Sequence, residues 1–367
     1  MESNLYSCQF GQRFDLNELE KELSKLKPEI DKGGFQSVNF NLAKVRLIDL
    51  GALLYLICIL NFLKAKGLQV NITLPESKEE ATEKDKKAVE KVRDFLKRWR
   101  FDDALEENVD MLQNLLPEHQ QGYFESPLKH YKPRIETSPE GKIEPLISVR
   151  LMEITSLTEI DRKEGRKIVS REKIEEYVKR LNHYTIRPIV AEALDFSDAN
   201  VEQFSKVLIR EGLLNTEEHP NATISLISMV REPSLSYLVI AIVDNGEGIP
   251  DTIRNVYEND PDVKKVEIPS DADLIDYAFD SRLIEYATQP MTTSKSARPD
   301  PNRGMGLYYL KTLSVDFGGY MIVRAGDASA QFKKEGDEIK RSDRRVSKWR
   351  GNLIKIFLPL SKTAKSL

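Results

Sequence analysis

The apolar run LIDLGALLYLICILNFL, from Leu47 to Leu63, constrains the fold of this chain more than any other feature. Asp49 interrupts it, and the run is shorter than the roughly 20 residues that a helix needs to span a bilayer. Gly67 follows at a position where a helix commonly ends. We therefore predict a buried helix from Gly51 to Lys66 and no membrane span.

Strand patterns lie on both sides of this helix. VNFNL at 38–42 alternates as a strand does, Leu47 to Asp49 forms a short continuation, and LQVNITLP follows Gly67. Strand, helix and strand in this order predict a compact α/β unit with parallel pairing. An amphipathic helix is expected next, from Lys87 to Arg100, with Val89, Val92, Phe95, Leu96 and Trp99 at helical spacing.

This order of elements, followed by VRDFLKRWRFDDAL, resembles a STAS domain, the fold of anti-sigma-factor antagonists, over residues 1–110. The antagonists carry a phosphorylatable Ser or Thr at the start of the apolar helix. Here the stretch is Asp49-Leu50-Gly51-Ala52, which argues against a phospho-switch. The resemblance then implies an interaction or packing module that docks a protein partner.

Length and composition set the wider frame. The 367 residues, 40% hydrophobic and 31% charged, indicate a soluble protein of two or three domains. The formal net charge of -4 gives no general argument for nucleic acid or a membrane surface. The opening MESNLYSCQF lacks the pattern of a signal peptide, and Cys8 and Cys58 lack metal-ligand spacing. We expect a cytoplasmic protein with Cys58 as a buried structural thiol.

Residues 111–185 form a connecting region in this interpretation. HQQGYFESPLKHYKPRIETSPEGK is rich in Pro, Gly and polar residues, which predicts a linker or an extended hairpin. PLISVRLMEI is a candidate strand, and Lys173 to Leu181 and Val201 to Ile209 are candidate helices.

The stretch AIVDNGEGIP carries the first candidate site. Tyr237 to Val243 is a strand pattern that ends at Asp244, and Gly246 and Gly248 supply the backbone freedom that a turn around a ligand requires. Asp, Asn and Gly are also the residues of ordinary turns. DNGEGI alone therefore leaves both interpretations open.

Two further motifs flank it. Glu211 and Asn215 are four residues apart, so they share one face of a helix and can place a base beside an oxygen ligand for Mg²⁺. Gly304-Met305-Gly306-Leu307 precedes the helix pattern LYYLKTLSVDFGG, and a helix N-terminus favours an anion such as phosphate. Each motif alone also fits an exposed helix face or a loop without a ligand.

The order of the three motifs resembles the GHKL superfamily of ATP-binding domains, shared by gyrase, the heat-shock chaperone, histidine kinases and MutL. EGLLNTEEH looks like its N box, DNGEGI its first glycine box, RGMGL its second, and WRGNLIKIFLPL its last strand. The resemblance covers roughly residues 190–362, within a domain that we expect at 186–367, and it implies a Bergerat-type α/β sandwich, with helices on one face of a mixed sheet. The expected fold class is thus α/β and α+β.

The resemblance also implies roles. Glu211 would activate water as the general base, Asn215 would bind Mg²⁺ that bridges the phosphates, and Asp244 would accept the adenine amino group. Backbone at Gly246 and Gly248 would approach the nucleotide, and the turn from Gly304 through Met305 and Gly306 to Leu307 would cradle phosphate. Lys295 either reaches phosphate or is a solvated lysine of an ATP lid at residues 251–303.

Some residues depart from the family pattern. Asn352 follows Gly351 where the family often has Thr beside the adenine-reading Asp. His183 echoes a phosphoacceptor box but leaves no room for a second dimerisation helix before Glu211, and we interpret His219 as structural. We interpret the basic tract at 340–350 as a solvated hairpin between the last two strands, with nucleic-acid contact as the alternative.

Three functions remain open at this stage. The preferred one is a signalling ATPase that binds Mg-ATP and hydrolyses it, so that lid closure alters contacts with a partner or, in a homodimer, with the second subunit. The others are an anti-sigma-type serine/threonine protein kinase and a non-catalytic nucleotide-binding adaptor.

Overall fold

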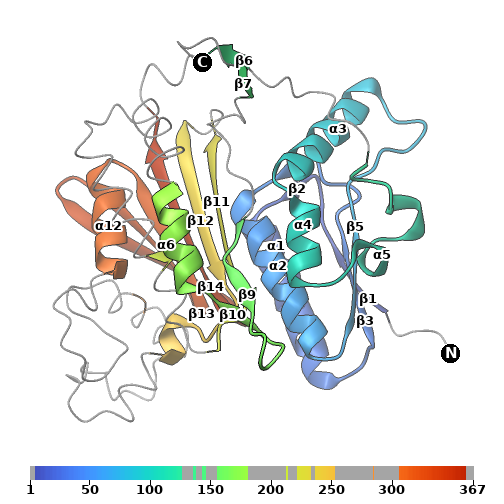
Figure 1. Ribbon diagram of the computed structural model, residues 1–367, viewed down its shortest axis with the longest axis horizontal. Coiled ribbons are helices and arrows are strands. Elements are labelled where there is room, and N and C mark those ends of the chain that lie inside the picture. Colours follow the sequence, from blue (N-terminus) through green and yellow to red (C-terminus); the bar gives the residue numbers. More distant parts are fainter. Residues whose placement is uncertain are drawn as a thin grey trace. The chain divides into compact units, whose positions relative to one another are not determined.

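The computed structural model describes residues 5–125, 135–137, 143–145, 155–180, 212–213, 221–232, 236–252, 284 and 306–360 (Figure 1). The chain forms two compact units, Met1–Ser156 and Leu157–Leu367. Residues 1–110 lie within the first unit and residues 186–367 within the second. The boundary between the units falls inside the connecting region.

The first unit is built on a parallel sheet. Its strands follow the order β1-β3-β5, and both pairings are parallel. The parallel pairing of β3 with β5 was predicted from the sequence, whereas β1 was not. β2 and β4 form a separate parallel pair, and β6 and β7 form an antiparallel hairpin within the predicted linker. The elements are β1 (Leu5–Gln9), β2 (Arg13–Phe14), α1 (Leu16–Lys32), β3 (Ser37–Asn41), β4 (Leu47–Ile48), α2 (Leu50–Ala65), β5 (Gln69–Thr73), α3 (Glu83–Arg98), α4 (Phe101–Asn108), α5 (Leu112–Leu115), η1 (Glu118–Gln120), β6 (Ile135–Thr137), β7 (Ile143–Pro145) and β8 (Thr155–Ser156).

Helix α2 is the apolar run that the sequence placed in the core. Every residue from Leu50 to Leu60 is buried. Asp49, which interrupts the run, is its N-cap, and the Asp49 carboxylate accepts a hydrogen bond from the Ala52 N–H at 2.9 Å. Cys58 is buried and unoxidised within this helix, as expected. Burial also raises the pKa of the Cys8 thiol to about 12, so that thiol is protonated and unreactive at neutral pH.

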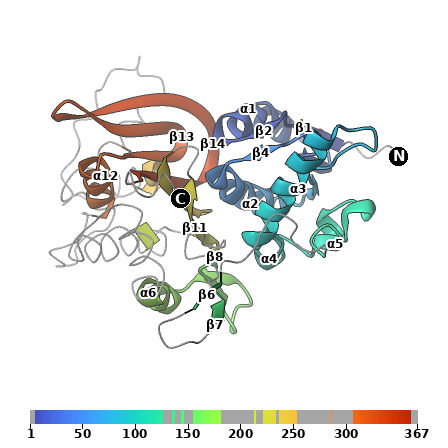
Figure 2. The ribbon, with the colours of Figure 1, turned by 90° about the horizontal axis from the view of Figure 1, so that it is seen from above.

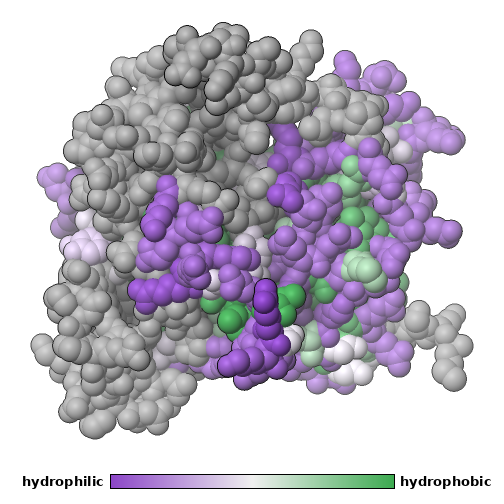
Figure 3. All heavy atoms as spheres, in the orientation of Figure 1, coloured by the Kyte–Doolittle hydropathy of each residue, from purple (hydrophilic) through white to green (hydrophobic). Residues whose placement is uncertain are grey.

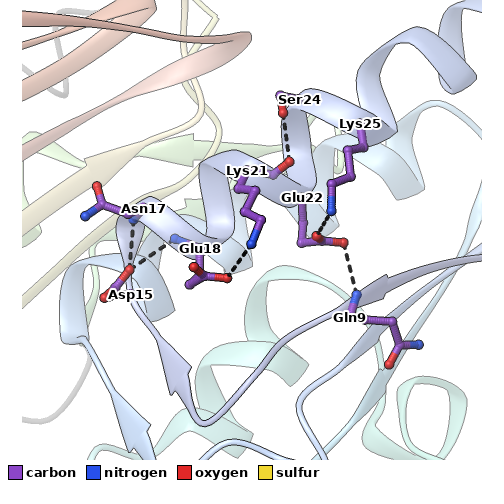
Figure 4. A network of polar contacts seen from close by, with 8 residues as sticks. All are labelled: Gln9, Asp15, Asn17, Glu18, Lys21, Glu22, Ser24 and Lys25. Atoms are coloured by element: carbon purple, nitrogen blue, oxygen red, sulfur yellow. Dashed lines mark hydrogen bonds and ion pairs between the residues drawn. The ribbon is translucent and has the colours of Figure 1, made fainter.

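Helix α1 was not predicted from the sequence, and a polar network fixes its start (Figure 4). The Asp15 carboxylate caps it by accepting from the N–H groups of Asn17 and Glu18 at 3.0 and 3.1 Å. One turn later, Glu22 accepts from the Gln9 N–H at 3.1 Å and pairs with Lys25. Because Gln9 ends β1, the buried Glu22 carboxylate connects the helix to the sheet.

The second unit is built on an antiparallel sheet in which β13, β14, β12 and β11 lie side by side in that order. The three pairings among these strands are all antiparallel. Helix α12 packs on β13 and β14 (Figures 1 and 2). The elements are β9 (Thr158–Ile160), β10 (Lys167–Val169), α6 (Arg171–Arg180), β11 (Ser225–Glu232), β12 (Tyr237–Asp244), α12 (Gly306–Asp316), β13 (Tyr320–Glu335) and β14 (Glu338–Pro359).

The hairpin of β13 and β14 accounts for the basic tract. Figure 2 shows the two strands running together, and the turn lies at 336–337. Lys340 to Arg350 therefore belongs to strand β14 rather than to the hairpin turn. Most of its basic side chains are exposed, which fits both a solvated tract and one that contacts nucleic acid.

On the face drawn in Figure 3, the described side chains are mostly hydrophilic, with smaller hydrophobic patches between them. Leu47 and Met111 are among the exposed large apolar residues of the first unit. None of the described helices has the length and apolar character that crossing a membrane would require.

Candidate functional site

Three polar side chains stand in a row across the end of the central strands. Asp244 ends β12, and its register partners are Asn352 on β14 and Ser225 on β11. Residues directly opposite each other in an antiparallel ladder point to the same face. Asp244 is 3% exposed, Asn352 1% and Ser225 0%. A carboxylate, an amide and a hydroxyl thus share one buried edge of the sheet.

The Asn352 amide orients the Asp244 carboxylate. Its Nδ2 donates to Asp244 Oδ1 at 3.2 Å, to Asp244 Oδ2 at 3.1 Å and to the Glu247 carbonyl oxygen at 3.3 Å. Its Oδ1 accepts from the Ile249 N–H at 2.8 Å, where a helical turn begins at 249–252. The Gly246 N–H also donates to Asp244 Oδ1, at 2.9 Å. One side chain therefore secures both the carboxylate and the far end of the DNGEG turn.

The Asn245 side chain attaches the other side of this turn to the segment before β11. Its Oδ1 accepts from the N–H groups of Thr223 and Ile224, both at 2.9 Å, and its Nδ2 donates to Thr223 Oγ1 at 2.9 Å. A backbone held from both sides keeps its N–H groups in fixed directions. This is the preorganisation that a ligand-binding turn needs.

Glycines allow β14 to approach this turn closely. Gly351 has a φ of 88°, its N–H donates to the Gly246 carbonyl oxygen at 2.9 Å, and a Cβ there would lie 2.1 Å from the Asp244 carbonyl oxygen. A Cβ on Gly248 would lie 3.2 Å from the Gly326 nitrogen. No other residue type fits at Gly351 without displacing the backbone that carries Asp244.

The pairing of β13 with β14 is irregular beside the turn. Its register shifts on both sides of Gly326, as β-bulges do next to functional sites. Buried Arg324 lies beside this irregular part of β14. Its guanidinium donates to two carbonyl oxygens of β14, those of Trp349 at 3.3 Å and Ser347 at 2.5 Å. The irregularity is therefore stabilised from inside the sheet.

Gly212, which follows Glu211 in the sequence, lies close to one residue beside each of the other two motifs. A Cβ at Gly212 would lie 2.6 Å from Ile242 Cδ1 and 3.6 Å from Leu310 Cδ1. Gly212 follows Glu211 of the first motif, Ile242 precedes Asp244 by two residues on the same face of β12, and Leu310 is four residues beyond Gly306 on α12. The segment after Glu211 thus packs against both the strand that ends at Asp244 and the helix that begins at Gly306.

Known proteins add nothing to this geometry. Neither a scan against protein-family models nor a search of curated proteins found a match to the chain.

The structure places some of the predicted site residues and leaves others outside the described part. Asp244, Gly246 and Gly248 lie in the strand end and turn, and Gly306 and Leu307 begin α12, as the sequence predicted for that helix. Outside the described residues lie Glu211, Asn215, Lys295, Gly304 and Met305, together with residues 253–283 and 285–303 of the expected lid.

Two residues of the site carry more than the sequence analysis assigned to them. Asn352 was singled out only as a departure from a family pattern, whereas its amide nitrogen donates to both carboxylate oxygens of Asp244. Ser225 was not singled out at all, because nothing in the sequence relates β11 to the end of β12. Cross-strand register, which the sequence pattern does not give, was the missing information.

Proposed function

We propose that the C-terminal unit binds Mg-ATP and hydrolyses it as a switch that alters contacts with a protein partner or a second subunit. The observation that carries the proposal is the buried Asp244 carboxylate, oriented by Asn352 and Gly246 at the place where the segments after Glu211, before Asp244 and after Gly306 pack together. A buried carboxylate is costly unless it has hydrogen-bonding partners. A ligand amino group is the kind of partner that this position would accept.

The nucleotide would be bound through three kinds of group. Asp244 would accept a hydrogen bond from the adenine amino group, and the glycine turn would let the ring approach the backbone. The N-terminus of α12 at Gly306 would face an anionic phosphate, because unpaired N–H groups and the helix dipole favour negative charge there. Asn215 would hold Mg²⁺, which would supply positive charge to stabilise the phosphates, and Glu211 would accept the proton of the attacking water.

The parallel sheet and buried α2 of the N-terminal unit support a docking role for that unit. Asp49 caps α2 where the related antagonists carry a phosphorylated hydroxyl, so this helix start offers no phosphoacceptor of its own. We therefore propose that the N-terminal unit binds a partner protein in the cytoplasm and that the nucleotide state of the C-terminal unit controls this contact. A homodimer would serve the same purpose.

Titration calorimetry tests nucleotide binding. Asp244→Ala should weaken the affinity for a non-hydrolysable ATP analogue with Mg²⁺ by about tenfold to 100-fold, since the adenine amino group then lacks its acceptor. Asp337→Ala removes an exposed carboxylate from the hairpin turn and should leave the affinity unchanged. Unchanged affinity in a folded Asp244→Ala protein would show that adenine does not bind at Asp244.

Incubation with γ-labelled ATP and Mg²⁺ distinguishes the three functional classes. Label released as free phosphate supports the switch ATPase. Label transferred to protein supports the kinase, and label that stays on bound ATP, with candidate partners present, supports the adaptor.

A further inference from the structure

We propose that Ser225 is a base-recognition residue, which donates a hydrogen bond from its hydroxyl to ring nitrogen N1 of adenine. The inference rests on the proposed function, because it deepens the assignment of the Asp244 edge as the adenine site. Asp244 and Ser225 would then recognise two neighbouring atoms of the same edge of the base.

The Ser225 hydroxyl is buried without a partner among the residues that the structure describes. Its side chain is fully inaccessible, and Oγ makes no hydrogen bond there. Leaving a buried hydroxyl unpaired costs free energy, so most buried hydroxyls in folded proteins are paired. A ligand that supplies the missing acceptor would explain why the chain has Ser here rather than Ala.

The register places this hydroxyl beside the Asp244 carboxylate. The Ser225 carbonyl oxygen accepts from the Leu157 N–H at 2.9 Å, so the backbone polar groups of Ser225 point away from β12. Ser225 and Asp244 therefore form a non-hydrogen-bonded pair, the type whose side chains approach most closely. Both lie on the face that carries Ile242, against which Gly212 packs.

The chemistry of the pair matches adenine. On the amino edge of adenine, the N6 amino group is a hydrogen-bond donor and the adjacent N1 is an acceptor. A carboxylate beside a hydroxyl offers the complementary acceptor and donor. Asn352 already donates to Asp244 and to the Glu247 carbonyl and accepts from Ile249. Ser225 is therefore the residue of the row that remains to read N1.

The test compares ATP with 1-deaza-ATP, in which N1 is replaced by a C–H group. With wild-type protein, 1-deaza-ATP should bind about 2- to 12-fold more weakly than ATP, the range for one net hydrogen bond. Ser225→Ala should weaken ATP by a similar factor and should bind both nucleotides equally. If Ser225→Ala still prefers ATP by the wild-type factor, another group reads N1 and the inference is overturned.

Stability without nucleotide provides an independent readout. Ser225→Ala should be as stable as wild type or more stable in urea denaturation, because it removes a hydroxyl with no partner. Ser228→Ala is the matched control. Ser228 is equally buried on the same strand but lies on the opposite face. In contrast to Ser225, Ser228 has an interaction partner. Ser228→Ala should lower the unfolding midpoint and leave the preference for ATP over 1-deaza-ATP intact. A Ser225→Ala protein destabilised as much as Ser228→Ala would assign Ser225 a structural role instead.

The outcomes separate the two proposals. If wild-type protein binds neither nucleotide, the proposed function fails and the inference fails with it. If wild type binds ATP and 1-deaza-ATP equally, only the role of Ser225 is wrong and the adenine site remains.

Discussion

The Asn352 side chain uses its donor and acceptor ends for different purposes. Its amide nitrogen donates to Asp244 and Glu247, and its oxygen accepts the Ile249 N–H at the start of a helical turn. A Thr at this position has one hydroxyl, so it could not span the same groups. Asn at this position therefore attaches the carboxylate more extensively than a Thr would.

Arg46 plays a comparable role in the first unit. Its guanidinium donates to both carboxylate oxygens of Asp85, with Nε to Oδ1 at 2.6 Å and Nη2 to Oδ2 at 3.0 Å. It also donates to the carbonyl oxygens of Ala43, Val45 and Glu76. A planar guanidinium with several donors suits such a junction, whereas a Lys could not make the bidentate contact.

The Arg46–Asp85 pair predicts a pH dependence of stability. The hydrogen bond from Arg46 holds the pKa of Asp85 below its ordinary value. A carboxyl whose pKa is lower in the folded protein contributes stability above its unfolded pKa and loses it as the pH falls through the folded pKa. In urea titrations, Asp85→Asn should therefore be less stable than wild type at pH 6, and the difference should shrink toward pH 2.

The exposed pair Lys27 and Asp31 on α1 supplies the control, since its geometry is not bidentate. Asp31→Asn should show little difference from wild type at any pH. A pH-independent difference for Asp85→Asn would mean that the side chain acts through packing or capping rather than through its charge.

At the scale of elements, two glycines allow the effect of a left-handed backbone conformation to be distinguished from the effect of close packing. Gly336 in the turn of the β13–β14 hairpin and Gly351 within β14 both have positive φ, 65° and 88°. An added Cβ meets nothing within 4 Å at Gly336, but at Gly351 it would lie 2.1 Å from the Asp244 carbonyl oxygen. Alanine at position 336 would therefore cause only backbone strain. Alanine at position 351 would also displace the backbone that carries Asp244.

We predict that Gly336→Ala lowers the free energy of unfolding by about 1 to 2 kcal/mol, the usual cost of a left-handed conformation. Gly351→Ala should cost clearly more, because the steric overlap is with backbone that cannot rotate away. Gly351→Ala should also weaken nucleotide binding, whereas Gly336→Ala should not. Equal losses of stability in denaturant titrations would contradict the close approach of β14 to Asp244.

Individual elements differ in how far the sequence predicted them. The apolar run gave α2 within a residue at each end, and the strand ending at Asp244 and the helix after Gly306 were also predicted. Helix α1 was missed, although its leucines recur at helical spacing, and Pro28 lies inside it. The strand at 340–350 was not predicted, because its residues are mostly polar and show no apolar alternation. It is stabilised by its pairing with β13.

The sequence predicted the site residues that are neighbours in the chain, but not the contacts between residues that are far apart in the chain. Asp244, Gly246 and Gly248 are neighbours in the sequence, so their motif was visible. The contacts of Asp244 with Asn352 and its pairing with Ser225 depend on strand register. A one-residue slip would turn each of these side chains to the other face, and the sequence pattern does not determine which residues meet.

At the scale of the whole molecule, every described residue assigned to the nucleotide site belongs to the second unit. Ser225, Asp244, Asn352 and the start of α12 all lie within Leu157–Leu367. The first unit has a core of its own, formed by α2 and its parallel sheet. Under the proposed function, nucleotide chemistry would therefore belong to one unit and partner docking to the other.

A fragment containing residues 157–367 should therefore bind the ATP analogue with the same dissociation constant as the full chain, and residues 1–156 should bind none. Circular dichroism and urea denaturation would first establish that each fragment folds, and Asp244→Ala in the 157–367 fragment is the matched control for specific binding. Nucleotide control of a partner through the first unit would require coupling, which is reciprocal. A partner that binds the first unit should then change the ATP affinity of the full chain and leave that of the 157–367 fragment unaltered. If the folded fragment binds ATP much more weakly than the full chain without any partner, the first unit contributes directly to the nucleotide site.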